Sequence, residues 1–485
     1  MNVNKPGTPF LIIAGTIILL GGLSLLPWGE LTNNRFKNFN LIADLCPNQQ
    51  SQEVTTDETI DPELAAALGK DGATSRAAVV DSANIFIDNS ADGYSLYELV
   101  NPRPVAKSRD ADSTVIIEDY TIDGQGLKNL RNALKNRNKK VVRIAMIGDS
   151  YIEGDILTMD LRESLQNIYG GSGVGYMPAH SDLTGFRTTV SQSCSGWQKH
   201  DIRKNMREEM KTLPGEYCTA AGPAKTTYKG VDRKPYLNRW NTTTVLAKAP
   251  SGGSITLSTD SSSQTLQIPA DGKVHSLTIN ENTASANLTA TAGVEVFGVY
   301  MNENKGITVD NMSLRGNSGI THRALAVDLA HQMRPDVDYD LIIVEYGMNA
   351  LNSKQSNYSG YQKLMKQTIS RLKDCYPNAD ILFMGIGDRG QKLAGAFKSI
   401  PTSQHMTDAQ RDAARSTGVL FWDARQAMGG DGAAVSWREE GLVNPDYIHL
   451  NHKGGKRFSD LLFKAIQRNL NNTNTKKQFR KKLNK

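Results

Sequence analysis

One serine stands at a position where a nucleophile would be chemically useful. Residues 147–165 read IGDSYIEGDILTMDLRESL and place Ser150 between an apolar run and a helix-like pattern. A serine hydroxyl attacks an ester only when a base takes its proton and donors stabilise the oxyanion that forms. The rest of the chain must supply these groups, because a serine before a helix is otherwise an ordinary N-cap. We expect Ser150 to cap the helix in either case.

Two Asp-x-x-His pairs offer a base, at a spacing that lets the carboxylate hold the imidazole in one tautomer. Asp328 and His331 lie in an amphipathic pattern, RALAVDLAHQM, which is typical of an ordinary helix pair. Asp446 and His449 lie between an Asn-Pro turn and an apolar-periodic helix, so a loop presents both side chains. We predict His449 as the base and Asp446 as its orienting acid. His452 is an alternative base that fits a structural or surface role better.

Donors for an oxyanion are offered by two further loops. RGNSGIT at 315–321 is a glycine-rich turn that can offer a backbone N–H. EYGMNALN at 345–352 places the side-chain amide of Asn349 directly after an apolar run. With the amide of Ser150 itself, these groups form the predicted oxyanion hole.

The apolar pattern indicates which elements position these residues. Short apolar runs predict buried parallel strands at 141–147, 341–347, 379–387 and 418–424. Leu157, Leu161 and Leu165 recur at four-residue spacing, so a helix is expected after the first strand. The carboxyl ends of parallel strands are where α/β folds build their sites, and Ser150 follows such an end.

Between residues 185 and 305, apolar and polar residues alternate in short stretches broken by turn residues. This alternation is typical of antiparallel strands in a β-sandwich. We therefore predict one α/β domain interrupted by an all-β, sandwich-like insertion, with its use as a glycan-binding module left as a hypothesis. Trp197 and Trp240 are candidates for stacking on sugars, although lone tryptophans more often belong to a core.

The predicted organisation has six segments. They are an anchor or signal at 1–29, a linker or extension at 30–110, and the first part of the α/β domain at 111–184. The β-insertion at 185–305, the second part of the α/β domain at 306–470 and a basic tail at 471–485 follow.

The N-terminal segment contains FLIIAGTIILLGGLSLLPW at 10–28, which as a helix would span about 28 Å. We favour an uncleaved transmembrane helix over a cleaved signal, because the apolar core is long and no small-x-small site follows it. Both alternatives place the body of the protein on the periplasmic or outer side of the cell membrane.

Charge and cysteine content narrow the function classes. The formal net charge is +6, and residues 476–485 hold six of the basic residues and no acid, so the rest of the chain is neutral. A nucleic-acid-binding body is therefore not expected; the tail either contacts an anionic surface or is a disordered, solubilising end.

Cys194 and Cys218 are near enough in sequence to form a disulfide, which the sequence leaves open. No Cys-x-x-Cys or His/Cys cluster is seen, so we expect neither a metal nor a cofactor.

The order of these blocks resembles the SGNH (GDSL-type) hydrolase superfamily. The matching positions are Ser150 in GDS, Gly319 in GNSGIT, Asn349 in YGMN, and Asp446 with His449 in DYIH. The resemblance implies a three-layer α/β/α fold with a parallel sheet. It also implies a serine-hydrolase mechanism, with Ser150, Asp446 and His449 as the catalytic residues and Ser150, Gly319 and Asn349 as the oxyanion donors.

Within the superfamily, residues 148–178 are similar to the branch of bacterial peptidoglycan O-acetylesterases, which carry a carbohydrate-binding-module-like β-sandwich between the first two blocks. Two positions depart from the family pattern. The third block reads Gly-Met-Asn-Ala where Gly-x-Asn-Asp is commoner, but its asparagine is retained. Tyr151 stands where those esterases often have histidine, and this second departure leaves the fine substrate specificity open.

Three functions follow as hypotheses. The first is an esterase that removes O-acetyl groups from cell-envelope glycan. Its expected partners are the O-acetylated glycan and the membrane. The second is an O-acetyltransferase that receives acetyl groups from a membrane-bound O-acyltransferase. The third, an idle glycan-binding or scaffold protein, is disfavoured because no member of the triad is missing.

Overall fold

The computed structural model describes residues 114–182, 187–204 and 206–471. The predicted membrane segment, the extension after it and residues 472–485 of the predicted tail lie outside these residues. In the part of the chain that is described, no helix combines the length and the apolar character needed to cross a bilayer.

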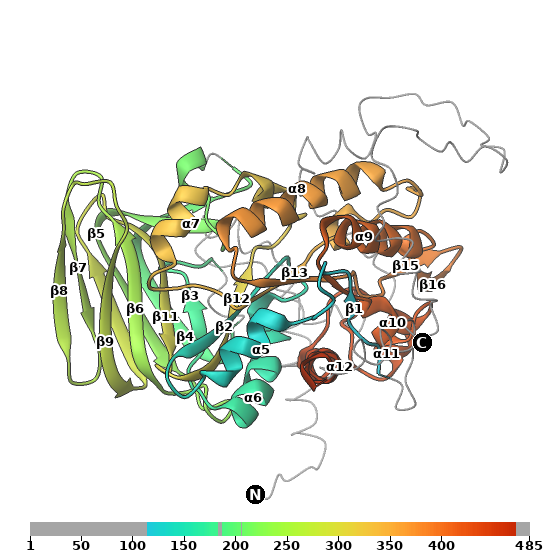
Figure 1. Cartoon of the computed structure of the whole chain (residues 1–485), viewed down its shortest axis with the longest axis horizontal. Coiled ribbons are helices and arrows are strands. Elements are labelled where there is room, and N and C mark those ends of the chain that lie inside the picture. Colours follow the sequence, from blue (N-terminus) through green and yellow to red (C-terminus); the bar gives the residue numbers. More distant parts are fainter. Residues whose placement is uncertain (1–113, 183–186, 205, 472–485) are drawn as a thin grey trace, which may run out of the picture. The chain divides into compact units, whose positions relative to one another are not determined.

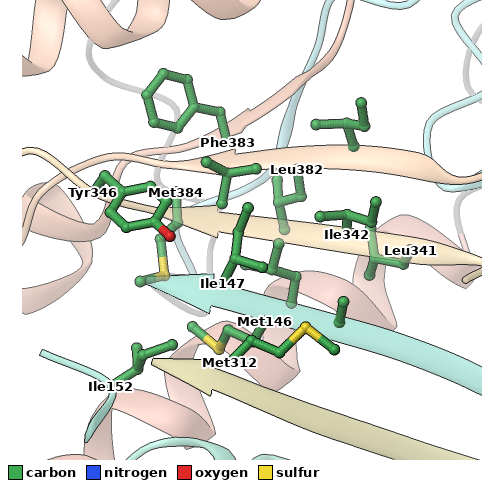
Figure 2. Close-up of a cluster of buried hydrophobic side chains, with 14 of the residues drawn as sticks. Met146, Ile147, Ile152, Met312, Leu341, Ile342, Tyr346, Leu382, Phe383 and Met384 are labelled. Carbon is green, nitrogen blue, oxygen red and sulfur yellow. The ribbon is translucent and has the colours of Figure 1, made fainter. Parts of the chain in front are cut away.

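A mostly parallel sheet forms the centre of the α/β part. Its strand order is β1-β17-β14-β13-β2-β12, and β1 alone in it runs antiparallel to its neighbour among the residues described. The bounds are β1 Glu118–Asp119, β2 Val141–Gly148, β12 Gly306–Ser313, β13 Leu341–Glu345, β14 Asp380–Met384 and β17 Leu420–Trp422. Strands therefore lie in all four predicted apolar runs. Side chains of β2, β12, β13 and β14 pack together into a buried core (Figure 2).

Helices cover both faces of this sheet (Figure 1). One face carries α5 Lys128–Lys135, α6 Thr158–Tyr169 and α12 His452–Asn471; the other carries α7 Val327–Met333, α8 Ser359–Cys375 and α9 Ser403–Thr417. The shorter helices are α10 Ala424–Met428, α11 Ala433–Glu439, η2 Glu153–Asp155, η3 Glu208–Met210, η4 Ile320–Ala324 and η5 Met348–Ala350. In α8, buried residues recur every three or four positions, so one stripe of the helix packs on the sheet. The result is the three-layer α/β/α arrangement.

A second, antiparallel sheet follows α6. Its nine strands in the described residues are β3 Gly175–Met177, β4 Val190–Asp201, β5 Glu216–Gly230, β6 Trp240–Lys248, β7 Gly253–Ser258, β8 Ser263–Ile268, β9 His275–Thr283, β10 Ser285–Ala290 and β11 Glu295–Asn302. The sheet begins before the expected boundary at residue 185, because β3 pairs with β11. A separate hairpin, β15 Gly390–Leu393 and β16 Ala396–Ser399, follows β14.

The second sheet encloses a core of its own. Leu257 of β7 and Leu288 of β10 belong to the same buried cluster as Val245 of β6 and Ile279 of β9, so the sheet folds over on itself. Trp240 is fully buried in this cluster and its Nε1 donates to Thr243 Oγ1 at 2.8 Å. The hypothesis that Trp240 stacks on sugars is therefore wrong, because both faces of its ring are covered by core side chains.

The two cysteines that the sequence left open are unpaired thiols in this structure. Cys194 Sγ lies 3.0 Å from His180 Nδ1, and Cys218 is buried beneath the carbonyl of His180. Trp197, the second tryptophan considered for sugar stacking, is half-buried and its Nε1 donates to Thr226 Oγ1 at 2.8 Å.

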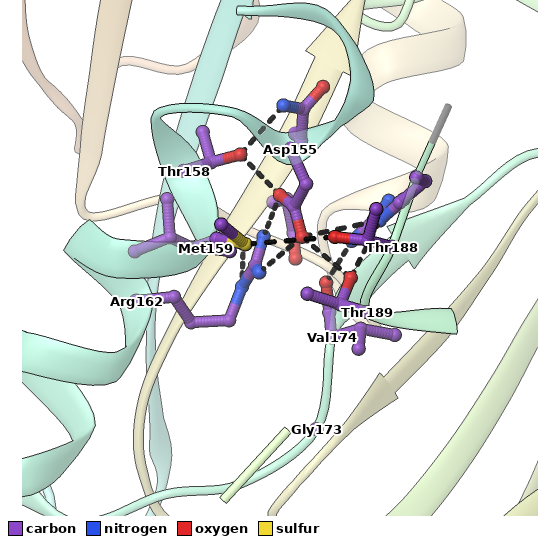
Figure 3. Close-up of polar contacts among 12 residues, drawn as sticks. Asp155, Thr158, Met159, Arg162, Gly173, Val174, Thr188 and Thr189 are labelled. Atoms are coloured by element: carbon purple, nitrogen blue, oxygen red, sulfur yellow. Dashed lines mark hydrogen bonds and ion pairs between the residues drawn. The ribbon is translucent and has the colours of Figure 1, made fainter. Parts of the chain in front are cut away.

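A buried ion cluster joins the turn after β2 to the segment that enters the second sheet (Figure 3). Asp155 is fully buried and accepts from Arg162 Nη1 at 2.9 Å and from Thr189 Oγ1 at 2.8 Å. Arg187 Nε lies 3.4 Å from the same carboxylate, and its Nη2 donates to Val174 O at 2.6 Å. Burial alone would raise the pKa of Asp155, but the two guanidinium groups hold it well below its ordinary value.

We predict that Asp380→Asn stabilises the fold in a pH-dependent way. Burial raises the pKa of Asp380 to about 6, although backbone N–H groups such as that of Leu130 favour its charged form. Since the folded-state pKa is raised, the contribution of Asp380 is complete below its ordinary value of 3.8 and is lost as pH rises through about 6. The neutral amide should therefore raise the free energy of unfolding by about 1–3 kcal/mol at pH 7.5 and by little at pH 4.

Urea unfolding at the two pH values measures this effect. Asp328→Asn, at an exposed aspartate of α7, is the matched control and should change stability equally little at both. A gain from Asp380→Asn that is the same at pH 4 and pH 7.5 would contradict the assignment.

Candidate active site

Ser150 lies in the tight turn that follows β2. A Cβ at Gly148 would come within 2.8 Å of Glu345 Oε2, so only glycine lets the ends of β2 and β13 approach so closely. The expectation that Ser150 caps a helix is wrong: α6 begins only at Thr158, and neither η2 nor α6 receives a side-chain cap. The Ser150 hydroxyl is directed elsewhere.

Three predicted residues, far apart in sequence, form one hydrogen-bonded chain. Ser150 Oγ lies 2.9 Å from His449 Nε2, and His449 Nδ1 lies 2.7 Å from Asp446 Oδ2. The other oxygen of Asp446 accepts from the backbone N–H groups of Ile448 and His449, at 2.9 and 3.0 Å. Nucleophile, base and acid thus stand in contact.

The electrostatics of Asp446 set the tautomer of His449. Partial burial tends to raise the pKa of Asp446, but the hydrogen bonds from His449 and from the backbone lower it overall. Asp446 is therefore a carboxylate at neutral pH and accepts the Nδ1 hydrogen of His449. This leaves Nε2 as the acceptor that faces the Ser150 hydroxyl.

The alternative histidines stand elsewhere. His331 is on α7 and its Nε2 bonds the carbonyl oxygen of Asp374 at 2.9 Å. His452 is the first residue of α12, and burial lowers its pKa. Among the hydrogen bonds of the described residues, neither histidine reaches Ser150.

A buried carboxyl pair supports the neighbouring loop. Asp149 is fully buried, and its Oδ2 accepts from Asn349 Nδ2 at 3.0 Å while its Oδ1 accepts from Tyr151 N at 2.9 Å. Burial, and secondarily the neighbouring Asp149, raise the pKa of Glu345 well above its ordinary value. Asp149 thereby fixes the side-chain amide of Asn349 at the edge where Ser150 lies.

Comparison with known proteins agrees with this geometry. Residues 276–457 match the model of the GDSL-like lipase/acylhydrolase family. The chain carries a GDSL-type serine hydrolase domain. The matched region contains Asn349, Asp446 and His449, whereas Ser150 precedes it and is brought to the hydrolase site by the fold.

A solved structure of another protein shares the fold of this chain. A structure of a peptidoglycan O-acetylesterase aligns with 73% of this chain and 99% of its own, at 22% identity and a TM-score of 0.59. This likeness confirms the SGNH hydrolase fold. An acetyl xylan esterase aligns at 18% identity, covering 33% of this chain and 81% of its own, with a TM-score of 0.25. A family two carbohydrate esterase from Cellvibrio japonicus aligns at 8% identity, covering 58% and 98%, with a TM-score of 0.23. No curated protein sequence matches the chain.

Gly319, a predicted oxyanion donor, makes an internal hydrogen bond in this structure. Its N–H donates to Asn317 Oδ1 at 3.0 Å, and the residue is buried. A Cβ at this position would lie 2.5 Å from the ring of Tyr346, so the glycine is needed for close packing. An oxyanion therefore competes with Asn317 Oδ1 for the amide hydrogen of Gly319, and the role of Gly319 as an oxyanion donor stays a prediction.

Gly316 is a further candidate donor, which our reading of the sequence missed. It follows β12 in a turn whose Leu314 N donates to Gly148 O at 2.9 Å, directly beside the strand that leads to Ser150. Its φ is +73°, it is half-buried, and its N–H makes no hydrogen bond to the residues described. The sequence did hold a signal for Gly316, because it is the first glycine after the strand β12. The candidate donors are then Ser150 N, Asn349 Nδ2 and the backbone N–H groups of Gly316 and Gly319.

Asn349→Ala is expected to lower kcat of the hydrolase domain about 10²–10³-fold with little change in KM. Besides its bond to Asp149, Asn349 Nδ2 lies 3.1 Å from Asn317 O, so an oxyanion competes with this carbonyl for one amide hydrogen. The loss should appear in kcat because the charge on the oxygen develops only in the transition state.

Steady-state hydrolysis of p-nitrophenyl acetate measures the effect. Asn352→Ala, in the same loop, is the control and should keep kcat within about twofold of wild type. Equal losses in the two variants would mean that the loop has been disturbed and that Asn349 has no special role.

Proposed function

We propose that the protein is an esterase that removes O-acetyl groups from cell-envelope glycan. The observation that carries the proposal is the contact chain from Ser150 through His449 to Asp446, at the carboxyl edge of the parallel sheet. Support for a glycan substrate comes from the fold that the chain shares with a peptidoglycan O-acetylesterase. The sequence-based expectation of a membrane anchor fits an enzyme that faces the cell envelope.

The proposed mechanism has two halves. His449 Nε2 takes the proton of Ser150 as its oxygen attacks the ester carbonyl, and Asp446 stabilises the imidazolium that forms. The oxyanion is held by the Ser150 amide, by a glycine amide of the 315–321 loop and by Asn349. His449 then protonates the sugar oxygen that leaves, and a water molecule activated by the same imidazole releases acetate from the acetyl-serine.

Tyr151 does not decide which ester is accepted in this scheme. Its ring is buried, it packs edge-on against Phe458, and its hydroxyl lies 3.5 Å from Met428 Sδ. The departure from the family pattern at this position therefore affects the core beneath the turn. Specificity must come from residues that surround the exposed side of Ser150 and His449.

Acetate release by the wild-type chain and by Ser150→Ala tests the proposal. The substrates are p-nitrophenyl acetate and O-acetylated peptidoglycan, with and without an unacetylated glycan acceptor whose products are followed by mass spectrometry. Release that depends on Ser150 and is unchanged by the acceptor supports hydrolysis. Acetylated acceptor formed at the expense of acetate would favour an acetyltransferase, and release that is independent of Ser150 would contradict both.

A further inference from the structure

A stacked aromatic pair, one ring exposed and one half-buried, links the proposed catalytic loop to a neighbouring hairpin. The rings of Phe397, on strand β16, and Tyr447, between Asp446 and His449, are stacked with centroids 3.7 Å apart and planes 7° from parallel. Phe397 is nevertheless 38% exposed, which is unusual among the large apolar side chains of the described residues. Tyr447 holds a positive φ of 58°, a strained backbone for a residue with a large side chain.

The hairpin that carries Phe397 is fixed to the catalytic edge at its root. Gly390 N donates to Tyr447 O at 2.8 Å, and a Cβ at Gly390 would lie 2.8 Å from Tyr447 Cβ. Just before it, Arg389 Nη1 donates to Met348 O at 3.2 Å, beside Asn349. The root of the hairpin therefore contacts both the loop of the base and the loop of the proposed oxyanion donor.

The far strand of the hairpin is also held rigidly. Ser399 Oγ donates to Asp388 Oδ2 at 2.6 Å and accepts from Gly432 N at 2.6 Å. The same carboxylate oxygen accepts from Ala434 N at 2.9 Å, which ties β16 to α11. The aromatic pair is thus presented on a preorganised support, and little ordering is required when a ligand binds to it.

We infer that Phe397 and Tyr447 form a platform on which a sugar ring of the substrate stacks while its acetyl ester enters the site of Ser150. The C–H face of a pyranose is apolar and flat enough to cover an aromatic ring, and the exposed ring of Phe397, backed by Tyr447, provides such a surface. The platform rests on the proposed function and adds a specificity-determining site to it. Tyr447 lies two residues before His449, so the platform adjoins the loop that carries the base.

The test separates glycan binding from ester chemistry. The full chain carrying Ser150→Ala is titrated with soluble O-acetylated peptidoglycan fragments, with and without Phe397→Ala. We expect Phe397→Ala to raise Kd roughly tenfold and Phe397→Tyr to keep it near the parent value. Lys398→Ala, the next residue on the same strand with its side chain on the opposite face, is the matched control and should leave Kd unchanged.

A second measurement uses chains with Ser150 intact and p-nitrophenyl acetate, which has no sugar. Unchanged turnover in Phe397→Ala, together with weaker glycan binding, supports the platform. Turnover lost in parallel with binding would overturn it, because the hairpin would then only support the His449 loop. Absence of glycan binding, or binding indifferent to Phe397, would overturn it as well. If binding depends on Phe397 but the wild-type chain releases no acetate from the glycan, the proposed esterase function fails while the platform stands.

Discussion

Replacing His449 by alanine is expected to lower kcat for ester hydrolysis by about 10⁴–10⁶-fold. The reason is that Ser150 Oγ has its 2.9 Å contact with His449 Nε2 and needs that nitrogen to accept its proton. Steady-state hydrolysis of p-nitrophenyl acetate, corrected for the uncatalysed rate, measures the loss of kcat. KM should change much less, because the imidazole acts on the nucleophile rather than on the bound ester.

The proposed triad also predicts non-additivity. Ser150→Ala should be as slow as His449→Ala, and the double variant should be no slower than either, because the residues act as a unit. His452→Ala is the matched control: it lies three residues along the chain, was the alternative base, and should retain nearly full activity. An inactive His452→Ala beside an active His449→Ala would reverse the assignment of the base.

Replacing Asp155 by alanine is expected to lower the free energy of unfolding by about 3–5 kcal/mol. The change removes the carboxylate but leaves the guanidinium of Arg162, fully buried, and that of Arg187, largely buried, without their shared anion. Because the pKa of Asp155 is held well below its ordinary value, this contribution is present throughout the neutral range and is lost only on strong acidification.

Urea unfolding at pH 7 checks this expectation against an exposed ion pair. Asp460 lies 2.8 Å from Lys456 on α12, both side chains being largely exposed, and Asp460→Ala should change stability by less than about 1 kcal/mol. Equal losses in Asp155→Ala and Asp460→Ala would show that the buried cluster does not stabilise the junction. Far-UV circular dichroism at 25 °C verifies that both variants are folded before the comparison.

The linear order of residues determined the elements and the candidates for the chemistry. Apolar runs as short as 141–147 predicted strands because a parallel strand covered on both faces has no other composition available to it. The Asp-x-x-His spacing singled out Asp446 and His449 because a local loop sets their relation, and local relations are readable in sequence. The resemblance to the SGNH family supplied the expectation that Ser150 meets them, although Ser150 and His449 are 299 positions apart in the sequence.

Tertiary structure alone decided which polar groups are already satisfied. Gly319 and Gly316 look alike in RGNSGIT, yet only the folded turn engages the first amide with Asn317 and leaves the second without a bond among the described residues. Likewise, Trp240 is buried because the second sheet folds over it. Phe397 meets Tyr447 because a hairpin crosses to a loop that lies 50 residues further along the chain. Hydrogen-bond satisfaction and burial depend on what neighbours in space provide, and that information is absent from any local pattern.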